Sequence, residues 1–135
     1  MKKLFFFLLL CGFTGFAQNA TVGTIAPYPA LFPVFPGCEE SSQNQMMRCF
    51  QEKLKQHIRD NYNYPTEAQK NGLKGSAIVT YSIEADGFVK ITKVEGEHQI
   101  LNEEAKRIIQ LLPKMDPAYQ NGKPIAFPMT VPIKF

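Results

Sequence analysis

The closing segment, Ile125-Ala-Phe-Pro-Met-Thr-Val-Pro-Ile-Lys-Phe135, alternates large apolar residues with prolines and small or polar residues. Successive side chains of a β-strand point to opposite faces, so this period of two predicts a strand with one buried face. The odd-numbered residues are the large apolar ones, and the even-numbered residues include both prolines. The chain is therefore expected to end in a half-buried strand.

The two prolines of this segment, Pro128 and Pro132, predict where the strand lies in its sheet. The N–H groups of alternate residues point to opposite edges of a strand, so both prolines remove donors from the same edge. Within a sheet, proline occurs where its missing N–H faces away from the ladder. We expect an outermost strand that pairs through its odd-numbered residues and keeps donors on its open edge at Ala126, Thr130 and Lys134.

Two amphipathic helices are predicted upstream of this strand. Apolar residues recur every three or four positions over residues 45–61 and again over residues 101–112. Asn102 has the residue type of a helix N-cap, with Glu103 and Glu104 then placed favourably on the helix dipole. Thr66 is expected to cap a further short helical turn that Gly72 ends.

A hairpin lies between the two longer helices. Residues 75–83 alternate as a half-buried strand, Ala85-Asp86-Gly87 has the composition of a hairpin turn, and residues 88–95 form the return strand. A change of parity near Thr92 indicates a bulge. A right-handed crossover then places the last strand beside the first. The prediction is an α+β domain with both helices on one face of a three-stranded antiparallel sheet, in the order second, first, last.

The amino-terminal segment has the features of an export signal. Met-Lys-Lys precedes a short apolar run, and Gly15 and Ala17 supply the small residues that a signal peptidase reads. We therefore expect residues 1–17 to be a signal peptide cleaved after Ala17, and an uncleaved inner-membrane anchor is the alternative. A proline-rich extension follows over residues 18–44, and the domain itself spans residues 45–135.

Export would place Cys38 and Cys49, the two cysteines outside the predicted signal peptide, in an oxidising compartment. A bond between them would fix the extension to the first helix, and closing a loop of this length is worth roughly 3 kcal/mol. A redox-active pair is the alternative, but the close Cys-x-x-Cys spacing that tunes thiol reactivity is missing. A structural disulfide is the preferred interpretation.

Charge and motif content exclude several classes of function. Without Lys2 and Lys3, thirteen basic residues face twelve acidic ones, so the mature domain lacks the basic face that nucleic-acid binding requires. His57 falls beside an apolar helical stripe, and His98 with its neighbouring glutamates provides too few ligands for a closed zinc site. We expect no catalytic site, no metal and no cofactor.

A series of short motifs runs along the carboxyl-terminal part of the chain, with a helix or strand expected between them. They are Tyr64-Pro65, Ala68, Gly72, Gly75, Asp86-Gly87, Leu101, Ala105, Pro113, Asn121-Gly122-Lys123-Pro124 and Pro132-Ile133-Lys134-Phe135. In this order they resemble the TonB carboxyl-terminal domain family over residues 45–135. The stretches Phe32-Pro-Val-Phe-Pro-Gly-Cys-Glu39 and Met47-Arg-Cys-Phe50 resemble an extension of Bacteroidetes members.

The resemblance implies a non-enzymatic role in energy transduction. In the family, an inner-membrane motor pulls through this domain on the amino-terminal peptide of an outer-membrane transporter, and the peptide adds a strand to the last strand of the sheet. The contact residues implied here are Ala126, Pro128, Met129, Thr130, Val131, Pro132, Lys134, Tyr64 and Pro65.

Signal cleavage would leave a periplasmic module that binds a transporter peptide without pulling on it. If the amino-terminal segment is retained, the motor components become additional partners. The alternative function is a structural periplasmic domain that dimerises through its edge strand. A third, a small secreted inhibitor, would need a longer loop than Ala85-Asp86-Gly87.

Overall fold

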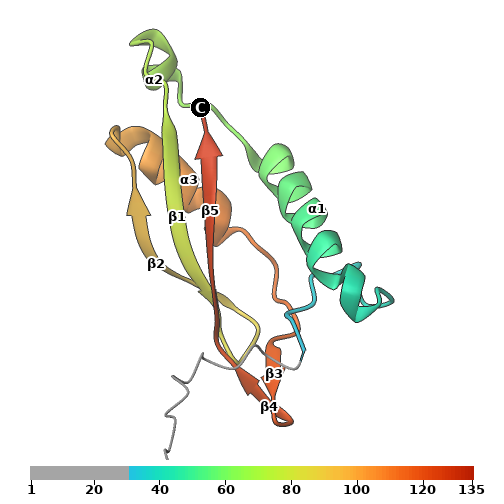
Figure 1. Ribbon diagram of the computed structural model, residues 1–135. Coiled ribbons are helices and arrows are strands. Elements are labelled where there is room, and N and C mark those ends of the chain that lie inside the picture. The colour runs from blue at the N-terminus through green and yellow to red at the C-terminus, as the bar shows by residue number, and fades with distance from the viewer. Residues whose placement is uncertain (1–30) are drawn as a thin grey trace, which may run out of the picture.

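A computed structural model describes residues 31–135 of the chain (Figure 1). The predicted signal peptide and the first part of the extension lie outside these residues. The elements are α1 (Gln43–Asn61), α2 (Thr66–Lys70), β1 (Ser76–Ile83), β2 (Val89–Glu95), α3 (Gln99–Gln110), β3 (Ala118–Gln120), β4 (Lys123–Ile125) and β5 (Phe127–Lys134).

The main sheet has the predicted strand order. Its three strands run in the order β2-β1-β5, and β1 is antiparallel to both neighbours. The proline-bearing strand β5 is therefore outermost, with β1 on one side (Figure 1). The α+β fold class and the three-stranded antiparallel sheet predicted from the sequence are confirmed.

The pairing of β5 follows the parity that its prolines require. The N–H of Phe135 donates to the carbonyl of Gly75 at 2.9 Å, and the N–H of Gly75 donates to the carbonyl of Phe135 at 3.5 Å. Hydrogen-bonded pairs alternate along an antiparallel ladder, so Val131, which faces Val79, also pairs with β1. Pro128 and Pro132 have the opposite parity, and their missing donors face the open edge.

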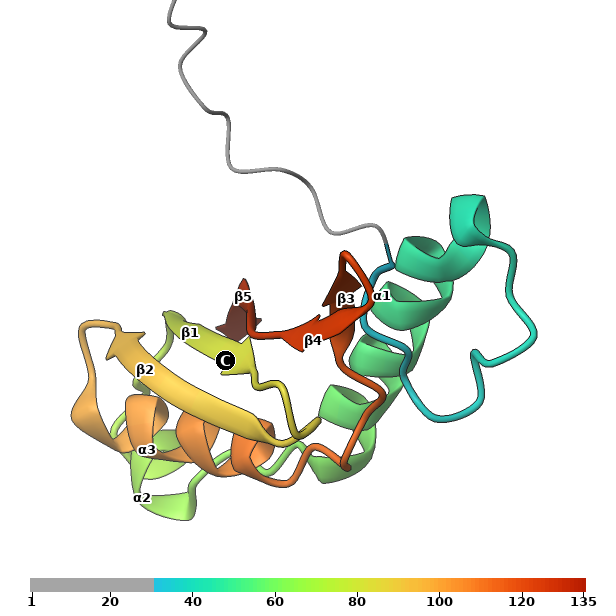
Figure 2. The ribbon, with the colours of Figure 1, turned by 90° about the horizontal axis from the view of Figure 1, so that it is seen from below.

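The core lies between the sheet and the two longer helices. The odd-numbered side chains of β1 are fully buried, as are most residues of the predicted stripe on α3. In Figure 2, α3 runs along one face of β1 and β2, and α1 lies on the β5 side of the molecule. The stripe of α1 enters the same core through Met46, Phe50 and Leu54.

The hairpin between β1 and β2 has the predicted turn and bulge. Gly87 has φ of +86°, and a Cβ there would collide with the backbone carbonyl oxygen of Met115, so glycine is required. The register of the β1–β2 pairing shifts by one residue between Thr80 and Tyr81. The extra residue, in β2, is Thr92. The Thr92 hydroxyl donates to the carbonyl of Thr80 at 3.1 Å.

Two predicted helix caps are wrong. Helix α3 begins at Gln99, three residues before Asn102, whose amide instead donates to the carbonyl of Gly96 at 3.1 Å. Thr66 is the first helical residue of α2, with Pro65 at the N-cap and no side-chain cap. Proline is favourable at a helix start because its φ is preset and its N–H is not needed there.

The closing strand is shorter than predicted. Ala126 interrupts it, and the residues before Ala126 form β4, which pairs with β3. Asn121 and Gly122 both have positive φ, as a two-residue type I′ hairpin turn requires. The sequence indicated this turn but not the two short strands beside it.

The extension packs on the domain where the sequence expected it to. Cys38 and Cys49 form the predicted disulfide, with their Cα atoms 6.0 Å apart. Phe35 lies edge-on to Phe50 with a ring separation of 5.6 Å. The N–H of Val34 donates to the carbonyl of Asp116 at 3.0 Å, and the return bond measures 3.2 Å. The extension thus covers part of the core and the start of the β3–β4 hairpin.

Burial of Tyr81 predicts a loss of stability in alkali. Desolvation raises the pKa of its hydroxyl from 10.0 to about 12, because the phenolate is disfavoured in the core. The unfolded chain therefore ionises first, and the stabilisation present below pH 10 is lost as pH rises to 12. Denaturant titrations should show the wild type losing about 2–3 kcal/mol more than Tyr81→Phe over this range. Equal losses in the two proteins would contradict the prediction.

Candidate functional site

The open edge of β5 is the first part of the candidate site. Pro128, Thr130, Pro132 and Lys134 are exposed and share the strand's even parity. Among them, Thr130 and Lys134 keep an N–H, since proline has none. Ala126, predicted as a third donor, precedes the strand. The edge thus offers a carbonyl at every even position but only two donors, with Thr130 near the middle.

The opposite edge of the sheet is built differently. Strand β2 contains the bulge at Thr92 and carries exposed Lys90 and Lys93, and Lys93 pairs with Glu95 at 2.6 Å. Bulges and lysines are two devices by which natural sheets prevent edge-to-edge pairing. Strand β5 has neither a bulge nor a lysine before its last residue. Its edge is protected instead by Pro128 and Pro132, and an incoming strand can use the N–H groups of Thr130 and Lys134 that remain.

A groove of about 300 Å³ adjoins the carboxyl-terminal end of β5. Its walls come from helix α1 on one side and β5 on the other. We call it the α1–β5 groove, and its lining residues are Lys55, Ile58, Arg59, Tyr62, Pro132, Ile133 and Lys134. Four of the lining residues are apolar, namely Ile58, Tyr62, Pro132 and Ile133, and the other three are cationic.

Aromatic contacts hold the end of α1 against the end of β5. The Tyr62 ring stacks on Phe135 with a centroid distance of 5.3 Å and an interplanar angle of 26°. Tyr64 lies 6.2 Å from the same ring, and its hydroxyl donates to the carbonyl of Leu73. Burial, and then the nearby Tyr64 and Glu104, raise the pKa of the Tyr62 hydroxyl. Tyr62 is therefore neutral at physiological pH.

Glu104 fixes the chain that leaves α1 and so positions Tyr62. Its carboxylate is buried, accepts from the N–H of Asn63 at 3.2 Å and pairs with Arg107 at 2.6 Å. Arg107 also donates to the carbonyl of Asn61 at 2.6 Å, and the bond to Glu104 raises the pKa of its guanidinium. The expectation that Glu104 serves the helix dipole is wrong, because α3 begins five residues earlier.

The sequence-predicted contact residues from Pro128 onward in β5 point to opposite faces of the sheet, and Tyr64 and Pro65 lie apart from them. Pro132 and Lys134 lie at the groove, and Pro128 and Thr130 continue the same edge. Met129 and Val131 point to the other face of the sheet, where both are partly buried against the core. Tyr64 and Pro65 lie beyond the end of β5, where Tyr64 is engaged with Phe135 and Leu73.

Five lining residues of the groove were not predicted as contact residues from the sequence. One is Ile133 of β5, and the other four, Lys55, Ile58, Arg59 and Tyr62, come from α1 and the residue that follows it. Their spacing of three and four positions places them on one side of α1. This spacing is a usable signal only once β5 is known to lie beside that helix.

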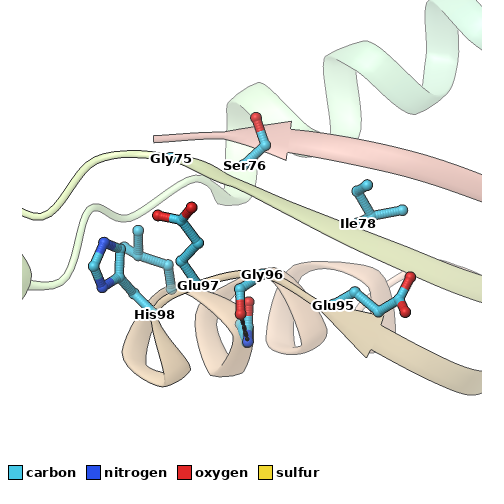
Figure 3. Close-up of a pocket in the computed structure, with 9 residues that line it drawn as sticks. Gly75, Ser76, Ile78, Glu95, Gly96, Glu97 and His98 are labelled. Atoms are coloured by element: carbon cyan, nitrogen blue, oxygen red, sulfur yellow. Dashed lines mark hydrogen bonds between the residues drawn. The ribbon is translucent and has the colours of Figure 1, made fainter.

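A larger pocket, of about 440 Å³, lies elsewhere, between the start of β1, the end of β2 and the start of α3 (Figure 3). Glu95, Glu97 and His98 line it, and Figure 3 shows the two carboxylates pointing to different parts of it. Within residues 31–135 no cluster of His, Cys, Asp or Glu could hold a metal ion. The other sequence-flagged histidine, His57, bonds the carbonyl of Ile108 at 2.8 Å.

None of the helices within residues 31–135 has the length and apolarity needed to cross a membrane.

Two solution NMR structures of the Helicobacter pylori TonB carboxyl-terminal domain are similar to this chain. One is 26% identical, covers 72% of this chain and 84% of its own, and has a TM-score of 0.44. The other is 29% identical, covers 64% and 91%, and has a TM-score of 0.41. A search of curated protein sequences gave no match.

The family model described as "Gram-negative bacterial TonB protein C-terminal" matches residues 60–135, which include α2, α3 and every strand. Because this match spans more than half of the chain, the protein belongs to the TonB carboxyl-terminal domain family.

Proposed function

We propose that this chain is an exported, non-enzymatic peptide-binding module that takes up the amino-terminal peptide of an outer-membrane transporter by strand addition to β5. The observation that carries the proposal is the open edge of β5, whose exposed backbone is interrupted only by Pro128 and Pro132. Family membership supports the same partner. The module works in the periplasm, in transport or in its modulation.

The composition of the edge sets the strength of the contact. Strand addition depends on main-chain hydrogen bonds, and the edge of β5 can donate only from Thr130 and Lys134. The incoming peptide therefore leaves some of its carbonyls to water, and its pairing is concentrated around Thr130. A footprint this small suits a weak, transient contact.

An NMR titration tests the proposal. Amino-terminal peptides of outer-membrane transporters should shift the backbone amide signals of residues 127–135, with the largest changes at Thr130. The amides of β2 provide an internal control, because that edge is bulged and charged. If a panel of such peptides leaves the β5 signals unchanged, the proposal is wrong.

Self-association through the same edge is the competing function. Two copies would pair their β5 strands, and the exposed edge alone does not distinguish a second copy from a peptide. Sedimentation velocity at increasing concentration separates the two. A monomer at high concentration excludes the dimer. If the protein is instead a dimer, and its β5 amides are protected from hydrogen exchange without any peptide, self-association is the better account and the proposed function is wrong.

A further inference from the structure

We propose that the α1–β5 groove selects an acidic side chain of the strand that adds to β5. This inference rests on the proposed function, because it needs a strand at that edge. It names a recognition element that the backbone ladder lacks, since main-chain bonds carry little sequence information. The occupant is an extended segment of another protein with Asp or Glu among its apolar residues.

The geometry of a sheet determines which peptide side chains reach the groove. Residues that face each other on neighbouring strands point to the same side of the sheet. The side chain of Ile133 points to the helix side, where it is buried and forms part of the groove. A peptide residue opposite Ile133 therefore also points to the helix side, toward Ile58 and Tyr62 of α1.

The charges around the groove decide what that side chain should carry. Lys55 and Arg59 line it from α1, Lys134 lines it from β5, and no acidic residue is among its lining residues. The ion pairs within residues 31–135 involve none of these three cations. The side chain of Lys134 has the parity of the opposite face, so a carboxylate on the helix side would meet chiefly the uncompensated charges of Lys55 and Arg59.

The acidic residues of α1 are occupied elsewhere. Glu52 pairs with Arg48 at 3.4 Å, and Asp60 accepts from Gln56 at 2.6 Å. Gln56 in turn accepts from one nitrogen of Arg59 at 2.8 Å, which leaves the other N–H groups of that guanidinium available. An arginine can bind a carboxylate through two parallel bonds, so Arg59 is the stronger of the two helix cations for this purpose.

The test uses a designed peptide in three forms. An acetylated and amidated seven-residue peptide of alternating Thr and Val carries Glu, Gln or Lys in place of its central Val. The Val side chains of the peptide should face the apolar, helix-covered side of the sheet. The residue that replaces the central Val should therefore point toward the groove. Affinity is measured from the shift of the Thr130 amide signal. We expect the Glu peptide to bind roughly threefold to tenfold more tightly than the Gln peptide at low salt, with the Lys peptide weakest.

Charge reversal on the protein provides the matched comparison. In Lys55→Glu combined with Arg59→Glu, both substitutions are on the exposed side of α1, and the preference should change to the Lys peptide. Lys90→Glu makes the same kind of charge change on β2, outside the groove, and should keep the preference for Glu.

The outcomes separate the inference from the proposed function. If the Glu and Gln peptides both shift Thr130 with equal affinity, or if charge reversal leaves the preference unchanged, the acidic subsite is wrong and strand addition stands. If no peptide shifts Thr130, the proposed function fails and the inference with it.

Discussion

Replacing Thr130 with proline should abolish peptide binding while the domain remains folded. Thr130 is the central donor of the open edge, and proline would leave Lys134 alone to donate along β5. Losing a hydrogen bond and leaving a peptide carbonyl unpaired in a complex this weak should lower affinity at least roughly tenfold. The measurement is the amide-shift titration, read at residues of β5 other than the substituted one.

Two variants control for side effects of the proline. Thr130→Val keeps both the N–H and the branched shape, so it should bind the peptide within about twofold of wild type. Met129→Pro places the proline at the parity that pairs with β1, and it should destabilise the fold by removing a ladder bond. A Thr130→Pro protein that binds normally would show that the peptide does not pair with this edge.

Removing the disulfide should give a large loss of stability. The bond joins residues 11 positions apart, and the loop-entropy model assigns roughly 3 kcal/mol to a loop of that length. Reducing it frees the extension, including Phe35, which is buried against Phe50. We expect Cys38→Ser combined with Cys49→Ser to lose about 3 kcal/mol in urea denaturation.

The same effect should follow from reductant acting on the wild type. Dithiothreitol should destabilise the wild type by about the same amount and leave the double-serine variant unchanged. Because neither cysteine belongs to β5 or lines the α1–β5 groove, peptide affinity of the folded protein should be unaffected. A change below roughly 0.5 kcal/mol on reduction would contradict the structural role of the bond.

The fold was predictable where periodicity and proline chemistry agreed. The parity of Pro128 and Pro132 placed β5 at the edge of the sheet before its partner was known, and the register confirms this. The bulge at Thr92 was visible as a change of parity in the return strand. Both features are local, since they depend on which way successive residues of one strand point.

Of the two errors at the start of α3, one concerns a local contact and the other a long-range contact. Asn102 is a good cap by residue type, yet α3 starts at Gln99 and the Asn102 amide bonds Gly96 from within the helix. Glu104 was assigned to the helix dipole, but it bonds Asn63, 41 positions away. A single sequence does not indicate a contact of that separation.

The candidate site also has one part that was predictable from local sequence and one part that depends on long-range packing. The edge of β5 could be recognised from 11 residues of sequence, whereas the α1–β5 groove combines residues of α1 with residues more than 70 positions later. Lys55 and Arg59 have the spacing of any solvated helix face. Only the packing of α1 beside β5, held by Tyr62 and Phe135, gives that face a role.

The most direct test is the detection of contacts between a bound peptide and the edge of β5. With isotope-labelled protein and an unlabelled transporter peptide, isotope-filtered NMR should show nuclear Overhauser effects between peptide protons and the amide and α protons of Thr130, with weaker ones near Lys134. The strand-addition account predicts this cross-strand pattern. Contacts confined to β2, or to α1 with none to Thr130, would contradict it.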